Sequence, residues 1–110
     1  MITMEDINFA KPRLHFFVCV NDRTTGLGNE KSSCGPMIKP EDVKEVKQWI
    51  RSQGLGAEVY CTMVRCLGFC NPEGGVMCVY PSGRFVKGLQ GVEDIKKVIL
   101  EEVARINQKL

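Results

Sequence analysis

The residues of this chain with the clearest capacity for chemistry are its six cysteines. Two of them belong to the segment Cys66-Leu-Gly-Phe-Cys70, a C-x3-C motif in a glycine-rich loop. Two thiolates at this spacing can approach one metal from neighbouring points of a loop, and the glycine lets the backbone fold tightly. Cys19 and Cys34 flank another long loop, between the first predicted strand and the first predicted helix. Ligands favour the carboxyl end of parallel strands, so these four thiolates could converge there.

A rival ligand set consists of Cys61, Cys66, Cys70 and Cys78, whose spacing loosely imitates that of plant-type ferredoxins. Two observations weigh against it. Cys61 and Cys78 lie inside predicted strands, where a free cysteine usually packs as a small hydrophobic residue. The rival set also leaves Cys19 and Cys34 without a purpose, although a free thiol in the polar loop around Cys34 would be prone to oxidation.

The spacing of the cysteines leaves the identity of the metal open. Four thiolates can hold zinc or an iron–sulfur cluster. Structural zinc sites usually have two closely spaced ligand pairs, whereas this chain has one such pair in the favoured set. Iron–sulfur is therefore favoured over zinc, and a structural zinc protein stays open. A thiol-redox protein is the weaker alternative, because the C-x-x-C motif of that chemistry is absent.

Composition and charge narrow the class of protein. With 44% hydrophobic and 25% charged residues, the chain has an ordinary globular composition. The net charge of +2 is small and spread along the chain, which disfavours nucleic-acid binding. Neither a secretory signal nor a membrane span is predicted, so we expect a cytoplasmic protein. A reducing compartment argues against a disulfide framework and in favour of metal binding.

The elements that must position the cysteines follow from apolar periodicity and turn residues. The first strand is a nearly continuous apolar run, which predicts burial on both faces of a parallel sheet. Pro40 is expected in the first turn of the first helix, and Gly54 just past its end. The predicted strands are 14–20, 57–63, 76–80 and 84–87, and the predicted helices run from 40 to about 53 and from 92 to 106.

This order predicts an α/β protein with the thioredoxin-like fold: β-α-β, then a β-hairpin, then a C-terminal helix. The β-α-β unit demands a right-handed crossover and a parallel strand pair. We interpret residues 1–110 as a single domain in which residues 1–13 form an N-terminal extension. The single histidine, His15, is expected to pack or face solvent, since a Rieske-type site needs two histidines. No catalytic residues are predicted.

Several segments resemble the thioredoxin-like [2Fe–2S] ferredoxins of bacteria, in the order that this family has them. They are the strand motif 17–23, the pair Ser33-Cys34, the C-x3-C motif, and the turn 79–83, Val-Tyr-Pro-Ser-Gly. The resemblance implies a thioredoxin-like fold, a homodimer, and a low-potential one-electron carrier that serves donor and acceptor enzymes.

Matched position by position, the resemblance implies that Cys19, Cys34, Cys66 and Cys70 bind one [2Fe–2S] cluster. Cys61 and Cys78 match no ligand of the family. The related electron-input subunits of NADH dehydrogenases and hydrogenases share the C-x3-C motif, but they normally carry an additional N-terminal helical region. Only about a dozen residues precede the first predicted strand here, which favours a free ferredoxin. The cofactor expected is thus a [2Fe–2S] cluster, and the partners expected are redox proteins, with no nucleic acid and no membrane.

Overall fold

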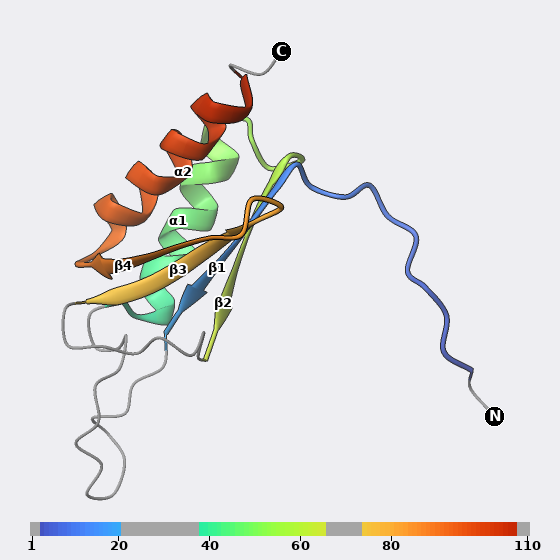
Figure 1. Cartoon of the computed structure of the whole chain (residues 1–110), viewed down its shortest axis with the longest axis horizontal. Helices are drawn as coiled ribbons and strands as arrows, with labels where there is room; N and C mark the ends of the chain where they lie inside the picture. Colours follow the sequence, from blue (N-terminus) through green and yellow to red (C-terminus); the bar gives the residue numbers. More distant parts are fainter. Residues whose placement is uncertain (1–2, 21–37, 66–73, 108–110) are drawn as a thin grey trace, which may run out of the picture.

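The computed structural model describes residues 3–20, 38–65 and 74–107 (Figure 1). Every predicted strand and helix is present in this part of the chain, with bounds that differ from the prediction by a few residues at most. None of the helices in the described ranges is long and apolar enough to cross a membrane. The elements in chain order are β1 (Leu14–Cys19), α1 (Pro40–Ser52), β2 (Val59–Val64), β3 (Gly75–Tyr80), β4 (Arg84–Leu89) and α2 (Val92–Asn107).

The strands form one mixed sheet in the order β2-β1-β3-β4. β1 pairs in parallel with β2, as the β-α-β unit requires, and its register joins Leu14 to Val59 and Cys19 to Val64. On its other side β1 pairs antiparallel with β3. β3 and β4 form the predicted hairpin. The first strand of the chain is therefore an inner strand, flanked by two neighbours that come much later in the sequence.

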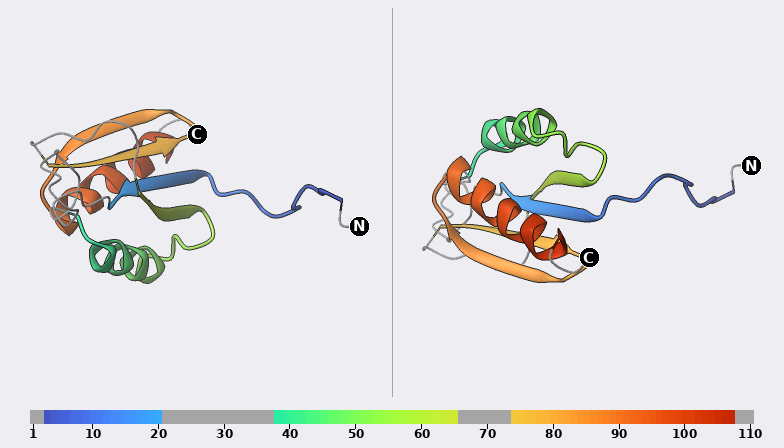
Figure 2. Two further views of the ribbon diagram at one scale, coloured as in Figure 1. Left: turned by 90° about the horizontal axis from the view of Figure 1, so that it is seen from below. Right: turned by 90° about the horizontal axis from the view of Figure 1, so that it is seen from above.

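Both helices cover the same face of the sheet (Figures 1 and 2). The prediction that β1 is buried on both faces is therefore wrong, because no described element covers the opposite face. Phe16 is fully buried under the helices, whereas His15 and Phe17 on the other face are half-buried. The core between the sheet and the helices includes Leu14, Phe16, Val18, Val43, Val46, Ile50, Val59, Cys61, Met77, Val79, Leu89, Ile95, Val98 and Ile99.

Helix α1 begins and ends where the sequence predicts. Pro40 is the first helical residue, and the Lys39 N–H donates a 2.9 Å hydrogen bond to the Asp42 carboxylate. This bond satisfies one of the amide groups that a helix N-terminus leaves without a partner. Gly54 follows the helix with a φ of 73°, a left-handed conformation that glycine adopts without strain. The predicted apolar stripe of α1 is buried against the sheet.

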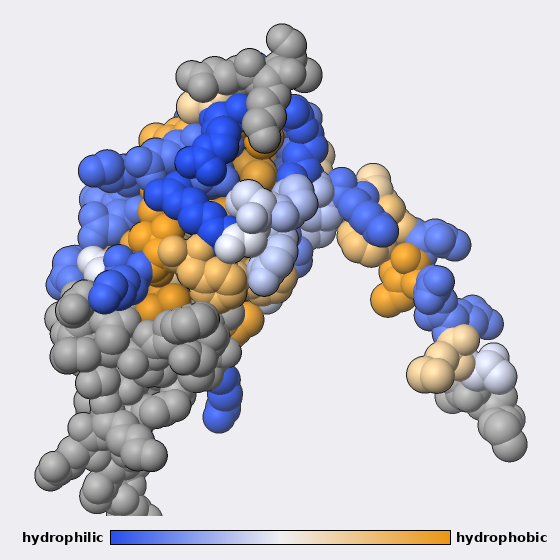
Figure 3. Space-filling view, viewed as in Figure 1, coloured by the Kyte–Doolittle hydropathy of each residue, from blue (hydrophilic) through white to orange (hydrophobic). Residues whose placement is uncertain are grey.

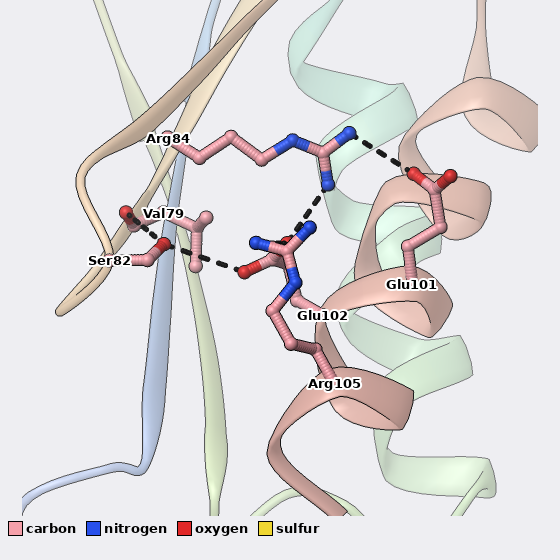
Figure 4. A network of polar contacts seen from close by, with 6 residues as sticks. All are labelled: Val79, Ser82, Arg84, Glu101, Glu102 and Arg105. Carbon is pink, nitrogen blue, oxygen red and sulfur yellow. Dashed lines mark hydrogen bonds and ion pairs between the residues drawn. The ribbon is translucent and has the colours of Figure 1, made fainter. Parts of the chain in front are cut away.

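A buried carboxylate joins α2 to the β3–β4 turn (Figure 4). Glu102 is only 1% exposed, and its carboxylate accepts a 2.9 Å hydrogen bond from Arg84 and lies 3.3 Å from Arg105. The Ser82 hydroxyl adds a 3.4 Å hydrogen bond. Arg84 also reaches Glu101, at 3.2 Å, on the exposed side of the helix. A carboxylate removed from water is tolerated when cations and donors surround it in this way, so Glu102 links the hairpin to α2.

We expect Glu102→Gln to lower the free energy of unfolding by about 2 kcal/mol, because two charge-assisted contacts lose their charge in a buried setting. The measurement is the urea midpoint with its slope. Glu101→Gln is the matched control: the Glu101 side chain is 48% exposed, so we expect a change within about 0.5 kcal/mol. Equal losses in the two variants would contradict the assignment of Glu102 as the buried link.

Candidate metal centre

Cys19 is the predicted site residue that the structure describes. It is the last residue of β1 and is fully buried. Its Sγ–H donates a 3.3 Å hydrogen bond to the Arg65 carbonyl, which belongs to the residue after the end of β2. The next residue along, Val20, donates its N–H to the Val64 carbonyl at 2.8 Å. The thiol of Cys19 therefore lies at the carboxyl end of the parallel β1–β2 pair, where α/β sheets most often bind ligands.

Cys34, Cys66 and Cys70 lie outside the described residues. In the sequence, Cys34 belongs to the segment 21–37, and Cys66 and Cys70 belong to the segment 66–73. The structure does place the residues that flank these two segments.

The flanking residues gather at one end of the sheet. Val20 and Arg65 are adjacent there through the contacts just given. On the return side, Ile38 packs so closely on Gly75 that a Cβ atom at position 75 would collide with the Ile38 side chain. The ribbons of β1 and β2 end, and those of α1 and β3 begin, at this same end of the molecule (Figure 1). Both segments that carry the remaining predicted ligands thus leave and rejoin the body beside Cys19.

Apolar side chains surround the Cys19 thiol. Cys19 and Val76 of β3 form a small buried cluster, and Val64 of β2 packs against it. Gly74, just before β3, has a φ of 143° and lies so close to the end of β4 that no side chain fits. The described wall of the site is therefore apolar, apart from the Arg65 carbonyl, which contacts the sulfur.

Cys61 and Cys78 occupy strand interiors on opposite faces of the sheet. Cys61 belongs to the core under the helices and pairs in register with Phe16. Cys78 pairs with Phe17, whose side chain lies on the other face. Both are buried, as predicted for cysteines that pack as small hydrophobic residues. Burial raises the pKa of the Cys61 thiol to about 11, although the nearby charge of Lys47 acts in the opposite direction. Burial also raises the pKa of the Cys78 thiol.

These positions make the rival ligand set unfavourable. A metal ligand is a thiolate, and burial disfavours the charged form of both thiols, which raises their pKa. Ligands on opposite faces of a continuous sheet also cannot meet at one metal without breaking the strands that carry them. Within the described ranges, no group of three or more His, Cys, Asp or Glu side chains could hold a metal ion.

The single histidine packs against neighbouring side chains, as predicted. His15 accepts or donates a 2.8 Å hydrogen bond with the Thr62 hydroxyl and stacks on Phe17, with ring centroids 4.2 Å apart. Partial burial lowers the pKa of the His15 imidazole. Met77 is fully buried in the core, and Met63 packs at its margin.

One contact of the site was missed in the sequence. The Arg65 carbonyl contacts the Cys19 sulfur, and a backbone oxygen has no sequence signature. The only available signal was its position, directly before Cys66 and at the end of the predicted strand.

No protein-family model matches the chain, and no curated protein matches it significantly. Solved structures do. The crystal structure of the wild-type thioredoxin-like [2Fe–2S] ferredoxin from Aquifex aeolicus is similar, with a TM-score of 0.65 and 26% identity over 83% of this chain and 85% of that chain. A cysteine-to-serine variant of that ferredoxin gives a TM-score of 0.67 and 25% identity, covering 82% and 86%. The predicted resemblance and the thioredoxin-like fold class are thus confirmed.

The burial of Cys61 predicts how stability responds to alkaline pH. A thiol whose pKa is raised from 9.0 to about 11 on folding stabilises the protein fully below pH 9, and this contribution is lost as the pH rises through 11. The loss is on the order of 2 kcal/mol. Between pH 9 and 11, we expect the free energy of unfolding of Cys61→Ala to depend less steeply on pH than that of the wild type. Unfolding is monitored by the fluorescence of Trp49. Parallel stability curves would show that Cys61 does not titrate in this way.

Proposed function

We propose that the chain binds one [2Fe–2S] cluster through the thiolates of Cys19, Cys34, Cys66 and Cys70 and works as a one-electron carrier. The observation that carries the proposal is the contact between the Cys19 sulfur and the Arg65 carbonyl, at 3.3 Å. Cys66 follows Arg65 directly in the sequence, and Arg65 lies at the end of β2 that adjoins Cys19, which supports a common site for the first and third proposed ligands. The similarity to solved structures of thioredoxin-like [2Fe–2S] ferredoxin supports the identity of the cofactor.

The donor chemistry fits this cofactor. Four thiolates are the ligand set that [2Fe–2S] clusters take, and soft sulfur ligands select such clusters over hard cations. In the described part of the chain, the free cysteines divide into Cys19 at a strand end and two thiols buried in strand interiors. The described residues that flank the sequence segments with Cys34, Cys66 and Cys70 lie at the same end of the sheet as Cys19, which supports a common site there.

The residues of the chain would hold and insulate the group. On ligation Cys19 gives up its thiol proton, and with it the hydrogen bond to the Arg65 carbonyl. Val64 and Val76 exclude water from that side of the sulfur, and the dryness of the shell is one of the factors that set a reduction potential. When bound, the cluster supplies reversible uptake of one electron. A carrier of this kind transforms no substrate, so we assign no catalytic residues.

Partners follow from the same proposal. We infer that the electron is exchanged with donor and acceptor enzymes in the cytoplasm, without nucleic acid or membrane. We also infer a homodimer, since most small soluble oligomers are two-fold dimers. Its interface is considered in the next subsection.

The first test concerns the type of cluster. We expect two irons and two acid-labile sulfides per chain in natively isolated protein, and a spin-one-half signal after reduction by dithionite. Zinc without sulfide would favour the structural zinc protein, and colourless metal-free protein would favour thiol chemistry. Four irons per chain would also sink the assignment.

The second test separates the cysteines. Alanine at Cys19, Cys66 or Cys70 should abolish or cripple cluster binding, because each removes a thiolate held by iron. At Cys34 we expect a milder effect, because the sequence around it, residues 24–35, is long and polar and offers substitute ligands such as a serine oxygen. Cys61→Ala and Cys78→Ala are the matched controls. They should keep the visible spectrum and lower stability by about 1 kcal/mol each, as for a small truncation in a packed core. Bleaching by the controls, with colour kept in Cys19→Ala, would reverse the sorting.

A further inference from the structure

A groove runs between α1 and the outer edge of β2, and Cys19 is not among its lining residues. Its volume is about 270 Å³. The apolar side chains of Ile50, Val59 and Cys61 form its floor, and Lys47 and Arg51 of α1 lie at its rim. The groove thus combines an apolar floor with two positive charges on one side.

The strand beside this groove has an unused edge. β2 is the last strand on its side of the sheet. Leu14 donates to the Glu58 carbonyl and Val20 to the Val64 carbonyl, so the even-numbered residues of β2 turn their backbone groups towards β1. The backbone groups of Cys61 and Met63 therefore point outwards. Such an edge is a template on which another extended segment can add as a strand.

The chain itself supplies an extended segment without a partner. Residues 3–12, the N-terminal arm, leave the body at the start of β1 and project away from it (Figures 1 and 2). Met4, Ile7 and Phe9 of the arm are 101%, 83% and 54% exposed. Hydrophobic and hydrophilic patches alternate along the arm in the space-filling view (Figure 3). Exposed apolar patches mark contacts with other molecules, and the arm carries three large exposed apolar side chains within six residues.

The arm and the groove are complementary. In an extended segment alternate residues share a face, so Glu5, Ile7 and Phe9 point the same way. Two apolar side chains can then cover the groove floor while the carboxylate reaches Lys47 or Arg51 at its rim. Asp6 adds a second negative charge. At roughly 3.3 Å per residue, the arm spans about 30 Å, more than enough to follow the length of β2.

The residues at the base of the arm direct it away from the groove of the same chain. The N–H groups of Arg13 and Leu14 both donate to the Glu58 carbonyl, which fixes the base of the arm at the start of β2. To reach its own β2 edge, the chain would have to reverse direction at the next residues outward. Pro12 opposes this, because a proline restricts the residue before it, Lys11, to extended conformations.

We propose that the arm of one copy adds as a strand to the β2 edge of a second copy, which returns its own arm to the first. Every copy carries both the arm and the groove, so a two-fold axis satisfies both contacts at once. The proposal deepens the homodimer inferred above and does not depend on the cluster. Iron content, measured on the same samples, separates a failure of the cofactor assignment from a failure of this one.

The test uses complementation between two damaged forms of the full protein. One lacks residues 1–11, and the other carries Lys47→Glu with Arg51→Glu. We expect sedimentation to show dimers of the 12.3 kDa wild-type chain, and each damaged form alone to dimerise at least about tenfold more weakly. An equimolar mixture should form heterodimers, because the intact arm of one form meets the intact groove of the other. A wild type that stays monomeric, or a mixture without heterodimers, overturns the proposal.

Two control variants test whether dimerisation depends on the charges of the arm and the groove, and on the positions of those charges. Glu5→Lys, added to the groove variant, should restore part of the dimerisation because the ion pair between the arm and the groove rim is re-formed with opposite signs. Lys39→Glu with Lys97→Glu changes the net charge equally at exposed positions outside the groove and should leave dimerisation unchanged. Loss of dimers in this control, or no rescue in the swapped variant, also contradicts the proposal.

A binding measurement with a separate peptide tests the proposal even where a substitution disrupts the fold. A labelled peptide of residues 1–13 should bind the arm-deleted protein and protect the outward amides of Cys61 and Met63 from hydrogen exchange. The peptide with Ile7→Asp and Phe9→Asp should bind at least about tenfold more weakly, since the apolar contacts are lost. Equal binding of both peptides, or protection elsewhere, would refute the proposed docking site.

Discussion

Backbone hydrogen bonds join β1 and β2 as a parallel pair. The positions of the candidate site and of α1 both depend on that pairing. A parallel pair has both carboxyl ends at the same edge, and here the edge holds Cys19 and Arg65. An antiparallel pair would have separated them by the length of the sheet. The connection that returns the chain to β2 contains α1, which must cross one face of the sheet to make the pair parallel.

The one-sided cover of the sheet explains how the chain keeps chemically similar cysteines apart. Cys61 faces the helices and Cys78 faces away from them, so the sheet itself lies between the two thiols. Neither stands at a strand end, where the backbone is free to bring several side chains to one point. All three thiols are buried, so Cys19 differs from the other two in its position along the strand. Strand position, and not burial, therefore separates the thiols that pack from the thiol that can ligate.

Apolar periodicity and turn residues were sufficient to predict the elements, because each is strongly amphipathic or apolar and is bounded by glycine or proline. They did not predict which face each helix covers, since both arrangements bury the same stripes. The buried Glu102 was assigned to the polar side of its helix, because only the distant Arg84 and Ser82 make its burial tolerable. At the candidate site, the strand-end position of Cys19 was predicted, but its contact with the Arg65 carbonyl depends on register, which no residue type encodes.

The inner position of β1 also bears on how the chain is made. Residues 14–19 leave the ribosome before either neighbouring strand, yet β2 begins at position 59 and β3 at position 75. During synthesis this apolar segment has no strand to pair with until the greater part of the chain has emerged. Pairings between segments so distant in sequence form slowly, and an unpaired apolar strand is prone to associate with other chains meanwhile. The nascent protein thus has a period of vulnerability that begins to close when β2 has been translated and ends when β3 has followed.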